Sequence, residues 1–161
     1  GSGAILVGFL YYCRDAVGVG VDISTEALKI AEENGQNLKI TDRVEWRQGD
    51  YLKAFDEEDI FDGIFSNPPY IPTKDIGGLS REVKHEPRLA LDGGTDGLYF
   101  YHLLAKGAAE HLKPGGFLAV EFGIGQATDI LEMFRKSAQY EDFEVIKDYG
   151  GIERALYCRK K

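Results

Sequence analysis

At 161 residues, with 43% apolar and 12% aromatic side chains, the chain has the size and apolar content of one soluble globular domain, which we expect to span residues 1–161. Its 19 basic and 27 acidic residues give a net charge of −8, which disfavours bulk DNA or RNA binding, because proteins that grip a phosphate backbone present a basic surface. No run reaches the roughly eighteen apolar residues of a membrane-spanning helix, and no basic stretch precedes an apolar one at the start, so we expect a cytoplasmic protein without membrane contact.

Apolar β-branched runs alternate with amphipathic stretches in the first half of the chain. We expect helices over residues 3–13 and 24–37 and strands over residues 16–21, 44–47 and 61–66. Ser24 is a suitable N-cap for the second helix. Strands and helices in alternation predict an α/β fold with a mostly parallel, Rossmann-like sheet.

The second half opens with a long segment, residues 71–96, that has no sustained period and carries glycine pairs at 77–78 and 93–94. Loops of this length usually carry function or are disordered. Beyond it we expect helices over residues 98–112 and 126–137 and strands over residues 117–122, 143–147 and 155–159. The breaker Lys113-Pro114-Gly115-Gly116 should end the first of these helices, and the last two strands should form an antiparallel hairpin at the sheet edge.

The two cysteines and three histidines show no metal-ligand spacing. Cys13 and Cys158 lie far apart in the chain, so we expect neither a zinc site nor a disulfide and interpret both as buried, reduced thiols. His85, His102 and His111 are interpreted as surface or helix residues. The sequence therefore predicts no bound metal.

Gly1-Ser2-Gly3 precedes the first expected helix and would let backbone N–H groups lie close against a ligand. The same tripeptide also occurs as a remnant of expression vectors, an alternative that the sequence leaves open. Asp22 ends the next strand, where a doubly wound fold places an acid that accepts hydrogen bonds from ribose hydroxyls. Together these residues predict a cofactor that contains a nucleoside.

Leu6 narrows the type of cofactor, because it stands where a dinucleotide fingerprint has its third glycine, and a pyrophosphate binder is therefore disfavoured. Gly49-Asp50-Tyr51 follows the next expected strand at the same edge of the sheet. There Asp50 has the chemistry to accept from an adenine amino group, and Tyr51 has the ring to cover a base face. Alternatively, Asp50 only caps a turn and Tyr51 packs on the surface.

Asn67-Pro68-Pro69-Tyr70 directly follows the strand expected over residues 61–66, and its two prolines end the hydrogen-bond ladder. A side-chain amide oxygen and peptide carbonyls without a ladder partner thus stand beside an aromatic ring. We call residues 67–70 the acceptor cradle, because its oxygens suit the two hydrogens of an –NH₂ group and Tyr70 can stack on a planar group. In the alternative interpretation the tetrapeptide is only a turn.

The order of these motifs resembles the HemK/PrmC family, the class I methyltransferases that modify the glutamine side-chain amide of peptide-chain release factors. The resemblance covers nearly the whole chain and rests on these stretches: Gly-Ser-Gly-Ala-Ile at 1–5, Val-Asp-Ile-Ser at 21–24, Gly-Asp-Tyr at 49–51, Asn-Pro-Pro-Tyr-Ile at 67–71, His-Glu-Pro-Arg-Leu-Ala-Leu at 85–91, Asp-Gly-Gly-Thr-Asp-Gly-Leu at 92–98, Leu-Lys-Pro-Gly-Gly at 112–116, Glu-Phe-Gly at 121–123 with Gln126, and Lys-Asp at 147–148. Asn-Pro-Pro-Tyr alone also occurs in adenine-N6 and other amino methylases, whereas the succession that follows it is much more specific.

The resemblance implies a cofactor, S-adenosylmethionine, which becomes S-adenosylhomocysteine, and a partner, the release factor. The residues that would contact the cofactor are Gly1, Gly3, Asp22, Asp50, Tyr51 and Asn67. The residues that would hold the target glutamine, within a Gly-Gly-Gln tripeptide, are Asn67, Pro68, Pro69 and Tyr70, with Asn67, Pro68 and Tyr70 as the catalytic set. The family often has tryptophan at the position of Tyr51. Tyr51 can take the same aromatic role, although its ring is smaller than that of tryptophan.

Two parts of the family pattern have no counterpart in this sequence. One is an N-terminal helical domain, and the other is the first strand of the sheet, which should lie between the strands that end at Asp22 and at Asn67. Without it, these two strands would stand at about twice the usual strand spacing of ~4.8 Å. We therefore expect that they do not pair with each other, and we interpret the chain as an N-terminally truncated catalytic domain.

Three other functions remain open on the residues alone. An adenine-N6 nucleic-acid methylase would use the same cradle for a flipped base, although the acidic charge argues against it. A nicotinamide oxidoreductase would share Asp22 but needs the third glycine. A cofactor-binding module without turnover would keep the fold and lose the substrate chemistry.

Overall fold

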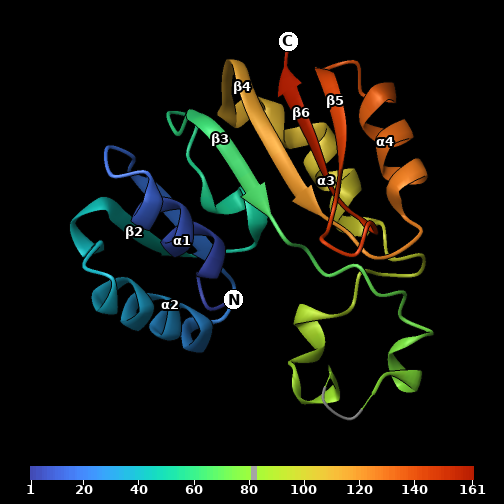
Figure 1. The fold of residues 1–161 in the computed structure, drawn as a ribbon, viewed down its shortest axis with the longest axis horizontal. Coiled ribbons are helices and arrows are strands. Elements are labelled where there is room, and N and C mark those ends of the chain that lie inside the picture. Colours follow the sequence, from blue (N-terminus) through green and yellow to red (C-terminus); the bar gives the residue numbers. More distant parts are fainter. Residues whose placement is uncertain (81–82) are drawn as a thin grey trace. The chain divides into compact units, whose positions relative to one another are not determined.

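The computed structural model describes residues 1–80 and 83–161 of a chain that forms two compact units. The N-terminal unit comprises Gly1–Asp56 and the C-terminal unit Glu57–Lys161. Each unit has its own β-sheet with helices packed on it (Figure 1). Across the described ranges, every helix is too short or too polar to cross a bilayer.

Two helices and a two-stranded parallel sheet make up the N-terminal unit. The helices are α1 (Ala4–Tyr12) and α2 (Thr25–Asn37), the strands are β1 (Gly18–Asp22) and β2 (Val44–Gln48), and short 3-10 turns occupy Thr41–Arg43 and Tyr51–Ala54. β1 and β2 run in parallel, with Asp22 opposite Gln48. Because both strands point the same way, the residues that follow them emerge at one edge of this sheet.

The helix starts of this unit agree with the sequence. The Ser24 hydroxyl accepts a hydrogen bond from the Ala27 N–H at 3.2 Å and so satisfies one of the free amides of the first turn of α2. Val7 and Leu10 of α1 pack with Ile40 and Trp46 to form the core of the unit. Burial of one face of α1 against β2 thus fixes the start of the chain near the strand tips.

A mixed four-stranded sheet with two α-helices forms the C-terminal unit. Its elements are β3 (Phe61–Ser66), α3 (Tyr99–Gly107), β4 (Leu112–Glu121), α4 (Ala127–Lys136), β5 (Tyr140–Lys147) and β6 (Glu153–Lys160). The strand order is β3-β4-β6-β5, with β3 parallel to β4 and β6 antiparallel to both of its neighbours. The predicted α/β fold, with parallel strands and a C-terminal antiparallel hairpin at the edge, is confirmed.

The helices α3 and α4 pack against each other, and α4 also packs on β5 and β6 (Figure 1). The largest fully buried side chains of this core are Tyr101, Tyr140, Phe122, Phe134, Leu104, Leu112, Leu118, Ile130 and Leu156. The Tyr101 hydroxyl donates to the Glu121 carbonyl at 2.7 Å and the Tyr140 hydroxyl to the Leu104 carbonyl at 3.2 Å. Both phenols therefore bury their rings without leaving a polar oxygen unpaired.

The breaker at residues 113–116 does not lie where the sequence predicts it. The helix expected to reach Leu112 ends at Gly107 and continues as the 3-10 turn Ala108–His111, and β4 already begins at Leu112. The pairing with β3 jumps from Phe61 opposite Leu112 to Gly63 opposite Phe117. A bulge of this kind accommodates a proline and a left-handed glycine inside a strand, because the extra residues leave the ladder.

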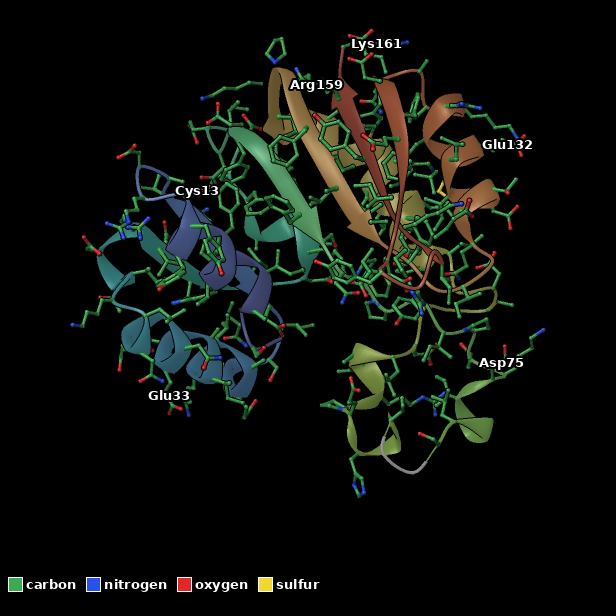
Figure 2. The ribbon with its side chains drawn as sticks, in the orientation of Figure 1. Cys13, Glu33, Asp75, Glu132, Arg159 and Lys161 are labelled. Carbon is green, nitrogen blue, oxygen red and sulfur yellow. The ribbon has the colours of Figure 1, made fainter. Side chains whose placement is uncertain are left out.

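The strands β1 and β3 belong to different sheets, so the direct pairing that would have contradicted the sequence interpretation is not observed. The prediction for the cysteines is correct for one residue only. Cys158 is buried in β6, whereas Cys13 is exposed at the end of α1 (Figure 2), and both are free thiols. Cys13 caps the helix through its backbone and is not part of the core, so its apolar neighbours were a misleading signal.

Candidate functional site

The residues predicted to bind a cofactor lie at the carboxyl edge of the β1–β2 sheet. Asp22 ends β1, and its carboxylate is half-buried. Its Oδ2 accepts a hydrogen bond from the Gly1 nitrogen, and its Oδ1 accepts one from the Ser24 N–H at 2.8 Å. The Gly49 N–H donates to the Asp22 carbonyl at 3.0 Å. Gly1, Asp22 and the 49–51 turn are therefore brought together within the N-terminal unit.

Gly3 is required by packing as well as by conformation. It is the N-cap of α1 with a φ of 71°, in the left-handed region that favours glycine. A Cβ at this position would lie 2.7 Å from the Trp46 ring and 2.8 Å from the Ala31 Cβ. The start of α1 therefore requires glycine at position 3. At position 1 it does not, because a Cβ at Gly1 would meet open space.

Asp50 and Tyr51 sit side by side in the turn after β2. Asp50 is exposed and pairs with the Lys53 ammonium at 2.5 Å, and its side chain caps nothing. Tyr51 adopts a φ of 54°, an uncommon conformation for a side chain of its size. Burial, together with the negative charge of Asp50, raises the pKa of the Tyr51 hydroxyl well above its ordinary value, so the ring stays neutral.

The carboxylate acceptors of this edge fit an adenosyl group. A carboxylate offers about four acceptor positions, and the described contacts of Asp22 use two of them. Its free positions suit a ribose diol, and the exposed oxygens of Asp50 suit an exocyclic amine. No group of three or more potential metal ligands forms anywhere in the described part of the chain.

The acceptor cradle follows β3 without a break in the C-terminal unit. Asn67 is exposed, Pro68 and Pro69 are buried, and Tyr70 is half-buried. Within residues 1–80 and 83–161, no hydrogen bond is made by the Asn67 side chain or by the Pro68 carbonyl. The exposed Asn67 side chain is therefore available to a ligand, while the two proline rings restrict the backbone that follows it.

The sequence assigned no role to Gln126, which the structure places beside the cradle. Its Nε2 donates to the Tyr70 carbonyl at 3.0 Å, and its Oε1 accepts from the Gly123 N–H at 2.9 Å. The Tyr70 carbonyl therefore has a side-chain partner in place of a ladder partner. The Gly-x-x-Gln spacing after β4 was the available signal, but a strand pattern does not say which loop the glutamine faces.

The long segment after the cradle is ordered by backbone and Asp92 contacts. The Ile71 N–H donates to the Leu91 carbonyl at 3.0 Å, and the Gly93 N–H donates back to the Ile71 carbonyl at 2.9 Å. The Thr73 hydroxyl, at 2.6 Å, and the Gly94 N–H hold the pKa of Asp92 below its ordinary value. Residues 81 and 82 of this segment lie outside the described part of the chain.

The comparison with protein families gives a match to the model described as "RMKL-like, methyltransferase domain" over residues 11–75. This match runs from α1 through the cradle. It includes Asp22, the 49–51 turn and Asn67, but neither Gly1 nor Gly3. The family match thus covers part of the motifs on which the methyltransferase interpretation rests, and it leaves out residues 1–5 and the stretches beyond residue 75.

A curated relative, named release factor glutamine methyltransferase, from Moorella thermoacetica is 41% identical over 161 residues. The alignment covers 100% of this chain and 56% of the relative, so the chain spans about half the length of the curated relatives it matches. The resemblance predicted from the motifs is confirmed.

Two solved structures show the same fold. A methyltransferase from Pyrococcus furiosus aligns over 98% of this chain and 69% of its own, with a TM-score of 0.70 and 22% identity. An RNA methyltransferase from Salinibacter ruber, in complex with S-adenosyl-L-homocysteine, aligns over 99% and 75%, with a TM-score of 0.57 and 18% identity. The chain therefore has a Rossmann-like methyltransferase fold.

Proposed function

The chain resembles the release factor glutamine methyltransferases from end to end, and on that premise we propose that it catalyses S-adenosylmethionine-dependent methylation of a release factor. The acceptor is the side-chain amide nitrogen of the glutamine in a Gly-Gly-Gln tripeptide. The observation that carries this proposal is the acceptor cradle, whose exposed Asn67 and adjacent Pro68 carbonyl have no partner among the described residues.

We assign the cofactor to the carboxyl edge of the β1–β2 sheet. Asp22 would accept the ribose hydroxyls, Asp50 the adenine amino group, and Tyr51 would lie against the base, with Gly1 and Gly3 leaving their backbone close to the ligand. The cofactor supplies an activated methyl group when bound. A neutral Tyr51 ring suits this position, because stacking on an uncharged base needs no ionised phenol.

We assign the amide to the cradle. The glutamine nitrogen is a poor nucleophile, because its lone pair is delocalised into the carbonyl. The Asn67 side-chain oxygen and the Pro68 carbonyl would each accept one N–H, and Tyr70 would stack on the amide plane. Positioning of this kind can lower a barrier by about 7 to 11 kcal/mol when the reacting atoms are held about 3 to 3.5 Å apart.

The test of the substrate is a methyl-transfer assay with the full-length protein. Labelled S-adenosylmethionine is incubated with a release factor in one arm and with an adenine-containing oligonucleotide in the other, and the labelled residue is mapped by mass spectrometry. We expect label on the glutamine amide only. Label on the oligonucleotide would instead identify an adenine methylase, and no transfer to either would leave a cofactor-binding module.

The test of the cradle is Asn67→Ala. We expect kcat to fall by about 100-fold or more, while the Kd for the cofactor, measured by calorimetry, changes much less. The matched control is Asn37→Ala, which removes another exposed asparagine at the end of α2. Near wild-type turnover in Asn67→Ala would disprove the role assigned to the cradle.

A further inference from the structure

One side chain joins the cradle to the end of the long segment that follows it. Gln126, half-buried just before α4, uses both hydrogens of its amide on backbone carbonyls, that of Tyr70 at 3.0 Å and that of Gly97 at 3.4 Å. Its oxygen accepts from the Gly123 N–H at 2.9 Å. Both donors and one acceptor position of this amide group are thus used on three separate stretches of backbone.

Two glycines make room for this arrangement. A Cβ at Gly97 would lie 2.3 Å from the Tyr70 carbonyl oxygen and 2.8 Å from Nε2 of Gln126. A Cβ at Gly123 would lie 2.9 Å from the Tyr70 ring and 3.0 Å from Oε1 of Gln126. Tyr70 is therefore held at its carbonyl by Gln126 and closely packed at its ring by Gly123, so neither end of the residue is free to shift.

We propose, on the basis of the proposed function, that Gln126 is a positioning residue for amide methylation. By fixing Tyr70 it fixes the backbone of the cradle, and with it the directions in which Asn67 and the Pro68 carbonyl accept from the substrate. Gln126 itself contacts no reacting atom. The reaction depends on this indirect role, because amide activation rests on alignment, and misplacement by about 1 Å can cost about 100-fold in rate.

Gln126→Glu tests the proposal with little change in shape. The variant keeps the oxygen that accepts from Gly123, but it replaces the donor nitrogen by an oxygen that faces two carbonyl oxygens. We expect kcat in the release factor assay to fall by about 100-fold, with the Kd for the cofactor unchanged. A kcat equal to that of the wild type would overturn the proposal.

Gln139→Glu is the matched control. Gln139 also donates both amide hydrogens to backbone carbonyls, those of Ala105 and Lys106, each at 3.2 Å, and it contacts no cradle residue. The same chemical change is thus made in the same unit without touching Tyr70. We expect kcat to remain within about threefold of the wild type. An equal loss in both variants would mean a general effect of the substitution and would overturn the positioning role.

The pH dependence of Gln126→Glu tests whether the ionised carboxylate causes the loss of rate. A protonated carboxyl again has one donor for the Tyr70 carbonyl and one acceptor for Gly123. Burial and the facing carbonyls raise the pKa of such a group, because they disfavour its charged form. The ratio of variant to wild-type kcat should therefore rise as the pH is lowered from 8 to 6. A ratio that falls or stays constant would contradict the proposal.

Hydrogen exchange separates failure of this inference from failure of the proposed function. The Ile71 N–H bonds to the Leu91 carbonyl and the Gly93 N–H to the Ile71 carbonyl, directly beyond Tyr70. Both amides should exchange faster in Gln126→Glu than in Gln139→Glu, whatever substrate the enzyme modifies. Unchanged exchange would refute the anchoring, whereas absence of methyl transfer by the wild type would refute only the assigned substrate.

Discussion

Asn67 and Tyr70 stand three positions apart and differ completely in how they are held. The Asn67 side chain is exposed and has no hydrogen-bond partner among the described residues, while Tyr70 is bonded at its carbonyl and packed at its ring. A group that must accept a substrate has to stay unpaired, and the group beside it must supply the rigidity. At the residue scale, the cradle is therefore a free acceptor on a fixed support.

The two thiols offer a direct test of the residue-scale description. Burial raises the pKa of Cys158 to about 12, so at pH 8 this thiol is protonated and shielded, whereas Cys13 is exposed. The thiolate is the reactive form. A chromogenic thiol reagent should label one cysteine in the folded protein and both in denaturant, and peptide mapping should identify Cys13. Rapid labelling of Cys158 in the folded protein would contradict its burial.

At the element scale, both candidate binding edges are made by strands that stop abruptly. β1 ends at Asp22 and is followed at once by the capped start of α2, and β3 ends at Ser66 and is followed by two buried prolines. A strand that stops leaves acceptors outside its ladder, and these acceptors can then meet a ligand. The ends of the elements, more than their interiors, carry the chemistry.

The cap of α2 is expected to contribute measurably to stability. Ser24→Ala removes the acceptor of the Ala27 N–H and should lower the free energy of unfolding by about 1 kcal/mol. Urea denaturation followed by circular dichroism measures this loss. Glu33→Ala, on the exposed side of α2 (Figure 2), is the control and should change the free energy by less than about 0.5 kcal/mol. Equal losses in the two variants would show that the Ser24 cap contributes nothing.

At the scale of the whole molecule, the chain forms two compact units. The proposed cofactor-binding residues belong to the N-terminal unit and the acceptor cradle to the C-terminal unit. In the C-terminal unit the hairpin β5–β6 is closed by Asp148, which accepts from the Ile152 N–H at 3.0 Å and from the Gly150 N–H at 2.8 Å. Arg154 pairs with the same carboxylate at 3.0 Å. These donors, led by the Ile152 N–H, hold the pKa of Asp148 below its ordinary value.

Stability should therefore decrease on acidification. The pKa of Asp148 is lower in the folded state than in the unfolded state, so the folded state binds fewer protons. The stability that Asp148 contributes is therefore fully present above about pH 4. It is lost as the pH falls through the pKa of the folded state. Asp148→Asn should have a lower Tm than the wild type at pH 6 and lose less Tm between pH 5 and pH 3. Asp75→Asn, which alters an exposed side chain (Figure 2), is the control. An identical pH dependence in wild type and Asp148→Asn would refute the assignment.

Local patterns determined the ends of the elements: the Ser24 cap, the stop at Asn67 and the antiparallel hairpin around 149–151 follow from residues a few positions apart. Tertiary structure alone decided that residues 113–116 form a bulge inside β4, that Cys13 is exposed, and that Gln126 bonds to Tyr70, 56 positions away. The physical reason is range: caps, turns and periodicity are fixed by neighbours in sequence, whereas register, burial and side-chain anchoring depend on what the fold brings alongside.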